Sequence, residues 1–125
     1  MIVADTDVLI DALRGKGAHG RMRLEIATGQ LATTAISVFE LWSGARSAEE
    51  HDKIERLLQA LTILQVDEAA AGEAARVRRD LESKGTPIGT ADYLIAGVCL
   101  VRGGLLLTRN REHFERVPGL TLGKL

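Results

Sequence analysis

The sequence predicts an α/β protein: a three-layer α/β/α sandwich around a central, mostly parallel sheet, formed by a single domain over residues 1–125. Three observations predict this fold. Short apolar runs alternate with longer segments of helical periodicity along the chain. The length of 125 residues suits one compact domain, and no linker, repeat or low-complexity segment divides it. A composition that is 46% hydrophobic and 26% charged favours a folded core over disorder.

Strands and helices alternate from the first residues onward. Strands are predicted over residues 2–4, 31–33, 62–66, 105–107 and 120–122. Helices are predicted over residues 7–13, 19–27, 36–45 and 91–101, and a longer one runs from a cap at Asp67 to Ser83. Thr90 is the predicted cap of the 91–101 helix, and residues 108–116 form a loop with room for a helical turn. Because strands and helices alternate, the sheet is expected to be parallel with helices on both faces.

Bulk properties narrow the functional classes. The formal net charge is −1, so a polyanion would have to be met by local arginines or by metal ions. The single cysteine, Cys99, lies in an apolar run and is predicted to be a buried thiol. An acid at position 5 interrupts the N-terminal apolar run, which argues against a signal peptide, and no apolar run is long enough for a membrane span. We therefore expect a cytoplasmic protein.

Three acidic residues stand where the predicted elements would place functional groups. Asp5 directly follows the first strand, and sites in parallel sheets form beyond the carboxyl ends of strands; capping of the next helix explains it equally well. Glu40 has apolar neighbours, so its carboxylate either needs a compensating cation or lies on a narrow polar stripe facing solvent. Asp92 opens the most apolar helix, where the helix dipole alone, worth about 0.3–1 kcal/mol, would favour an acid.

Taken together, these acids predict an oxygen-rich pocket at one edge of the sheet. Carboxylates brought close raise each other's pKa unless a cation is present. Hard oxygen ligands favour Mg²⁺ or Mn²⁺ over zinc, and the three histidines show no ligand spacing. A carboxylate-bound divalent ion is a common device of phosphodiester chemistry, because it binds the phosphate and lowers the pKa of the attacking water.

Four segments, in order, resemble the PIN-domain ribonucleases, and in particular the VapC toxins of bacterial and archaeal type II toxin–antitoxin pairs. They are IVADTDVLI (2–10), ISVFELWSG (36–44), IGTADYLIA (88–96) and LTRNREHFERVPGL (107–120). The resemblance covers the whole chain. It implies a PIN-like α/β/α sandwich and cleavage of RNA that depends on Mg²⁺ or Mn²⁺.

The resemblance also implies roles for individual residues. Asp5, Glu40 and Asp92 match three acidic positions of the family. We expect Asp5 and Asp92 to hold the metal directly, and Glu40 to complete the shell or position the attacking water. Thr6 matches a hydroxyl residue that orients the first acid.

At two positions the chain departs from the family pattern. The fourth acidic position is held by Asn110, with Glu112 nearby, so we expect one well-held metal ion and a weaker second site. Asp7 stands where Asn or Ser is common; it either joins the metal cluster or caps the next helix, and the cap is the preferred interpretation. Arg109 or Arg111 is the candidate contact for RNA phosphates.

The resemblance further implies partners. A VapB-like antitoxin is expected to lay an extended or helical segment over the acidic pocket, neutralising the carboxylates and excluding RNA. A homodimer is also implied. The apolar stripe at positions 54, 57, 58 and 61 is a candidate interface, although packing in the core is the better explanation for it.

Two other functions remain open from the sequence. The run Asp5-Thr6-Asp7-Val8-Leu9 looks like the opening motif of haloacid-dehalogenase-type phosphatases, with Asp5 as nucleophile and Asp7 as acid/base. That superfamily also needs a Gly-Asp motif near its end, and this chain has no Gly-Asp dipeptide. The second alternative is a non-catalytic RNA- or protein-binding domain with a degraded site.

Overall fold

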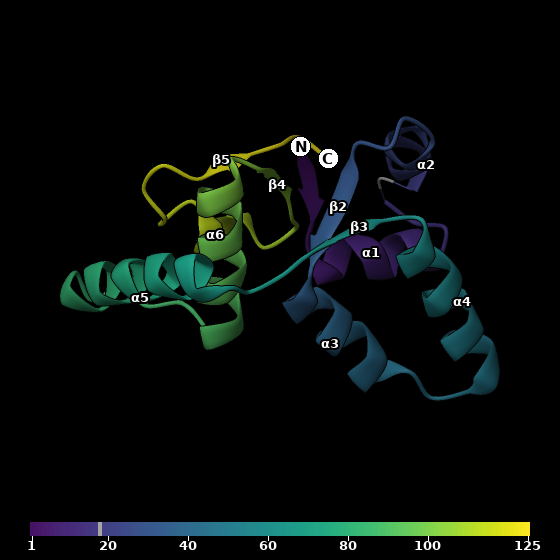
Figure 1. The fold of residues 1–125 in the computed structure, drawn as a ribbon, viewed down its shortest axis with the longest axis horizontal. Coiled ribbons are helices and arrows are strands. Elements are labelled where there is room, and N and C mark those ends of the chain that lie inside the picture. Colours follow the sequence, from purple (N-terminus) through teal and green to yellow (C-terminus); the bar gives the residue numbers. More distant parts are fainter. Residues whose placement is uncertain (18) are drawn as a thin grey trace.

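The computed structural model describes residues 1–17 and 19–125 (Figure 1). At its centre lies a five-stranded sheet in the order β3-β2-β1-β4-β5. The strands are β1 (Ile2–Ala4), β2 (Leu31–Thr34), β3 (Thr62–Leu64), β4 (Leu105–Leu107) and β5 (Thr121–Leu122). All four pairings are parallel, with Ile2 of β1 in register with Leu31 on one side and Leu105 on the other. The predicted parallel sheet is therefore confirmed, and β1 lies at its centre.

Helices cover both faces of this sheet, as Figure 1 shows. In the described part of the chain they are α1 (Thr6–Leu13), α2 (His19–Ala27), α3 (Ala35–Gly44), α4 (Ala48–Gln59), α5 (Glu68–Ser83), α6 (Thr90–Arg102) and α7 (Arg111–Phe114). The first four pack on one face and the last three on the other. This is the predicted three-layer sandwich.

The sheet has a hydrophobic core on each face, because successive side chains of a strand point to opposite faces. These two cores hold the three layers together. In β1, Val3 packs into the core beneath α5 and α6, whereas Ala4 packs into the core beneath α1. In β4, Leu106 and Leu107 divide between the two cores in the same way. The central strands are buried on both sides, which explains their continuous apolar sequences.

The apolar stripe that begins on α4 and ends just after it, at Leu61, belongs to the second of these cores. Ile54 and Leu61 are buried, and Leu57 and Leu58 are partly buried against the same cluster. The interpretation of this stripe as core packing is confirmed for these residues. Cys99 is also buried, as predicted, and burial raises the pKa of its thiol to about 12.

Most helix boundaries agree with the predictions to within one or two residues, and two caps differ. The first helix begins at Thr6 rather than at Asp7, because the Asp5 side chain caps it by accepting from the Thr6 backbone N–H at 2.8 Å. Thr90 is not a cap: it is the first residue of α6, and Gly89 occupies the cap position without a side-chain hydrogen bond. The predicted Asp67 cap of α5 is confirmed by its bond to the Ala70 N–H at 2.9 Å. Among the described residues, no helix is both long and apolar enough to cross a lipid bilayer.

Candidate active site

The candidate site lies at the carboxyl ends of β1 and β4, where the strand order reverses. The backbone N–H of Asp5 donates to the carbonyl oxygen of Leu107 at 2.9 Å, which extends the pairing of the two strands by one residue. Asp5 and Thr108 are the residues that directly follow these two neighbouring strands, so they lie side by side. The side chain of Thr108 closes this junction by donating its hydroxyl to Asp5 Oδ2 at 2.7 Å.

The carboxylate of Asp5 is buried, which disfavours its charged form. Its residue is only 6% exposed, and its two carboxylate oxygens accept one bond each, from Thr6 N–H and from the Thr108 hydroxyl. The pKa of Asp5 is raised to about 6: burial is the largest cause, the hydrogen bonds from Thr108 and Thr6 oppose it, and the charges of Asp7 and Asp92 add to it. The negative charges that surround Asp5 make this a place where a cation is stabilised.

Asp92 reaches the same place from the first turn of α6. Its Oδ2 accepts from the Asn110 side-chain amide at 3.3 Å and lies 3.0 Å from His113 Nδ1. Asn110 in turn donates its backbone N–H to the Thr108 hydroxyl oxygen at 2.9 Å. One short segment after β4, residues 108–113, thus contacts both Asp5 and Asp92, and it fixes their separation.

Glu40 joins the group from α3, through Thr6. The Thr6 hydroxyl donates to Glu40 Oε1 at 2.7 Å, across 34 positions of sequence. The Glu40 carboxylate is therefore directed at the start of α1 and does not merely face solvent. Thr6 differs from its implied role in one respect: its hydroxyl orients Glu40, whereas its backbone N–H orients Asp5.

Asp7 is not the helix cap, and this corrects the preferred interpretation. It lies in the first turn of α1, where its Oδ2 accepts from the backbone N–H of Arg109 at 3.1 Å. Its Oδ1 is buried and has no hydrogen-bond partner among the described residues. A buried carboxylate oxygen without a donor costs free energy, so this atom fits a site that receives a cation.

The remaining candidates lie farther out. Glu112 is 86% exposed at its side chain and lies 3.8 Å from Arg116, so the structure does not bring it to the other acids. Arg109 is more than half exposed, with its Nε 2.8 Å from Asp11. Arg111 donates to the carbonyl oxygen of Gly123 at 2.7 Å, which ties it to the C-terminal segment.

Sequence reasoning missed two residues of the site. Thr108 directly follows a predicted strand, as Asp5 does, and that position was the available signal. His113 gave no signal, because its approach to Asp92 depends on the one-turn helix α7.

A different group of possible metal ligands lies on α4. Among the described residues, this is the group of three in which one ligand atom from each, here His51, Asp52 and Glu55, falls within 4.8 Å of the others, and all three are exposed. No three of the described acids at the sheet edge lie this close together. None belongs to the predicted set. The orphaned Asp7 oxygen and the buried Asp5 carboxylate make the site at the sheet edge the better fit to a hard divalent ion.

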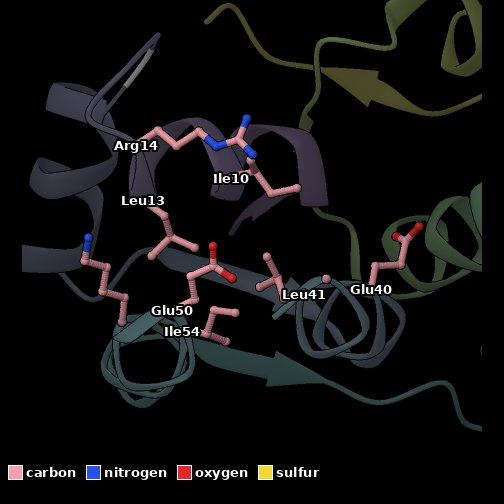
Figure 2. A pocket seen from close by; sticks show the side chains of 9 residues that line it. Ile10, Leu13, Arg14, Glu40, Leu41, Glu50 and Ile54 are labelled. Carbon is pink, nitrogen blue, oxygen red and sulfur yellow. The ribbon is translucent and has the colours of Figure 1, made fainter. Parts of the chain in front are cut away.

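A groove of about 290 Å³, lined by both apolar and charged side chains, lies between α1, α3 and α4 (Figure 2). Its lining includes Ile10, Leu13, Arg14, Leu41, Glu50 and Ile54, with Glu40 at one end. One end of the groove is therefore formed by an acid of the candidate site, Glu40.

Comparison with known proteins identifies the family. The model of the PIN domain matches residues 2–120. The chain belongs to the PIN-domain family. It is 32% identical over 122 residues to the tRNA(fMet)-specific endonuclease VapC of Salmonella typhimurium, covering 94% of this chain and 92% of the relative. It is 36% identical over 115 residues to ribonuclease VapC10 of Mycobacterium tuberculosis, covering 91% and 86%.

Solved PIN-domain structures agree over the same length. The VapBC2 complex of Rickettsia felis bound to promoter DNA gives a TM-score of 0.89 at 26% identity, covering 100% of this chain and 99% of that one. DNA-bound VapBC of Salmonella typhimurium gives a TM-score of 0.85 at 30% identity, covering 98% of both chains. The resemblance seen in the sequence is confirmed, and neither the phosphatase nor the degraded binding domain is favoured. PIN-domain nucleases generally depend on divalent metal ions, a requirement that the acids described above fit.

Proposed function

We propose that this chain, as a single domain over residues 1–125, is an endoribonuclease that depends on Mg²⁺ or Mn²⁺ and acts as the toxin of a VapBC-type pair. The observation that carries the proposal is the placement of Asp5, Glu40 and Asp92 at the sheet edge, where a chain of hydrogen bonds connects them, within a chain whose relatives are ribonucleases. The buried Asp5 carboxylate, with Asp7 and Asp92 close enough to raise its pKa, calls for a cation.

Asp5 and Asp92 are the residues that would hold the ion, and Glu40 would complete the site. When bound, the ion supplies a Lewis acid that binds the phosphate and makes water a better nucleophile. The Thr6 hydroxyl occupies Glu40 Oε1, which leaves Oε2 to accept a proton from the attacking water. Thr108 and the pair Asn110 and His113 hold Asp5 and Asp92 in place, so that little reorganisation is needed at the moment of reaction.

Arg109 is the better of the two proposed contacts for RNA phosphates. It directly follows Thr108, its backbone is fixed by Asp7, and more than half of its side chain stays exposed. Arg111 is engaged by Gly123 and lies 3.7 Å from Glu115. The relative from Salmonella is named for initiator tRNA, so we propose this RNA as the first substrate to test, beside ribosomal and messenger RNA.

The partner that fits this site is a VapB-like antitoxin, as in the complexes that share the fold. We propose that an apolar segment of the antitoxin lies in the groove and that a basic side chain reaches the acids from the Glu40 end. Leu13→Lys, in the groove, should then weaken the complex at least tenfold, whereas Leu24→Lys, on the exposed face of α2, should not. Equal binding by both variants would contradict this placement.

We also propose an oligomeric state and a location for the protein. A homodimer is proposed from the family, and sedimentation of the purified chain would test it. We place the protein in the cytoplasm, because its proposed substrates and partner are found there and because Cys99 is a buried free thiol.

The test of the function is RNA cleavage by the purified chain with Mg²⁺ or Mn²⁺, and again with EDTA. We expect cleavage that requires the metal and falls at least a hundredfold in Asp92→Asn, while Asp52→Asn, an exposed acid of α4, cleaves as the unaltered protein does. Cleavage in EDTA, or full activity of Asp92→Asn, would overturn the proposal. Absence of both cleavage and metal binding would favour the non-catalytic domain.

A further inference from the structure

Asp7 is a partly buried acid, and the burial of its Oδ1 has no complete explanation within the fold. The cap of α1 is Asp5, so Asp7 is not needed to start that helix. Its Oδ2 braces the loop after β4 through the Arg109 N–H, but its Oδ1 is buried without a partner among residues 1–17 and 19–125. An asparagine at position 7 would accept the same hydrogen bond from Arg109 N–H without adding a charge, so this bond does not explain why the residue is an acid.

The surroundings of Asp7 place it with the acids of the site. Asp5 is bound by the side chain of Thr108 and Asp7 by the backbone of Arg109, so both carboxylates lie against consecutive residues at the end of β4. The negative charge of Asp7 also acts on Asp5, which requires the two groups to be near each other. Two acids held this close repel each other when no cation is bound.

The next residue in the same segment is Asn110. It holds the fourth acidic position of the family pattern, and its amide donates toward Asp92 instead of adding a negative charge. Residues 108–110 therefore contact Asp5, Asp7 and Asp92 in turn. The charge that position 110 lacks is present a short distance away, on Asp7.

We propose that Asp7 Oδ1 is an additional ligand oxygen for the divalent ion and supplies the negative charge that Asn110 does not. This inference rests on the proposed function, since it assigns a further ligand to the same metal site. The competing explanation is that Asp7 only braces the loop. Asp7→Asn separates the two, because the asparagine oxygen still accepts from the Arg109 N–H while the charge is lost.

The test is direct binding of Mn²⁺ without RNA, followed by the electron paramagnetic resonance signal of the free ion. We expect Asp7→Asn to bind Mn²⁺ at least tenfold more weakly than the unaltered chain. Asp11→Asn is the matched control, because Asp11 lies on the same helix but pairs with the Arg109 side chain; its affinity should stay within twofold. In the double variant Asp7→Asn, Asn110→Asp the affinity should recover to within threefold.

Circular dichroism melting in EDTA shows whether each variant is folded. Asp7→Asn that is folded and binds Mn²⁺ within twofold of the unaltered chain would overturn the inference while leaving the proposed nuclease intact. If Asp7→Asn binds Mn²⁺ weakly and the double variant does not recover, the claim that Asp7 supplies the charge missing at position 110 would be overturned. If the unaltered chain itself binds no Mn²⁺, the proposed function fails first.

Discussion

Replacing Asp5 with Asn should stabilise the metal-free protein while it removes activity. Raising a carboxyl pKa from 3.8 to about 6 corresponds to about 3 kcal/mol, since a tenfold change in an equilibrium constant is worth about 1.4 kcal/mol. The asparagine oxygen still accepts from Thr6 N–H, but its amide cannot accept from the Thr108 hydroxyl, which therefore loses the acceptor it has in Asp5 Oδ2. We assign about 1 kcal/mol to that loss. The expected net gain at pH 7–8 is therefore about 2 kcal/mol, which for a domain of 125 residues corresponds to a rise in Tm of about 8 °C.

The pH dependence of this gain is its internal control. Below pH 3.8 the Asp5 carboxyl is protonated in both the folded and the unfolded chain, so its titration contributes nothing. Between pH 4 and about 6 the unfolded chain loses the proton while the folded chain keeps it, and the unaltered protein loses stability. The advantage of Asp5→Asn should therefore grow through this window and level off above it.

Thermal melting in EDTA from pH 4 to 8 measures this advantage. Asp52→Asn, which removes an exposed acid, should change Tm by less than the equivalent of about 0.5 kcal/mol at every pH. An Asp5→Asn protein that is less stable than the unaltered chain at pH 8, or an advantage that does not vary with pH, would refute the reasoning. Saturating Mn²⁺ should stabilise the unaltered chain and leave Asp5→Asn unchanged.

Two further substitutions test separate contacts. Thr6→Val removes the hydroxyl that donates to Glu40, so kcat for RNA cleavage should fall about tenfold while the affinity for Mn²⁺ changes little. Thr6→Ser keeps the hydroxyl and should keep the rate. Equal rates for the two variants would contradict the role of this bond. Gly97→Ala would place a Cβ 2.5 Å from the Ala70 carbonyl oxygen, and melting should show a loss of about 1–3 kcal/mol. Gly72→Ala, in open space on α5, should gain up to about 1 kcal/mol, and a comparable loss there would show that crowding is not the cause.

The sequence was sufficient to place Asp5 and Asp92, because their positions depend on local rules. Asp5 directly follows an apolar strand, and Asp92 opens an apolar helix, so strand ends and helix starts were sufficient to place them. The choice between site and cap for Asp5 had no single answer: the residue caps α1 with Oδ1 and faces Thr108 with Oδ2.

Contacts between distant segments could not be predicted from local patterns. Whether Glu40 faces solvent or the site depends on Thr6, which lies 34 positions away. The hydrogen bond from Thr108 to Asp5 spans 103 positions, and it exists because β1 and β4 are neighbours in the sheet. Asp7 was assigned to the cap for the same reason, since its bond to Arg109 follows from the strand order and not from its sequence neighbours.

Diffraction from crystals soaked in Mn²⁺, with anomalous data collected for manganese, tests the metal site most directly. The predicted result is an anomalous peak bounded by the carboxylates of Asp5 and Asp92, with Glu40 beside it, and loss of that peak in crystals of Asp5→Asn. A peak confined to His51, Asp52 and Glu55 on α4, or no peak in crystals of the unaltered chain at saturating Mn²⁺, would contradict the assignment of the acids at the sheet edge as the metal centre.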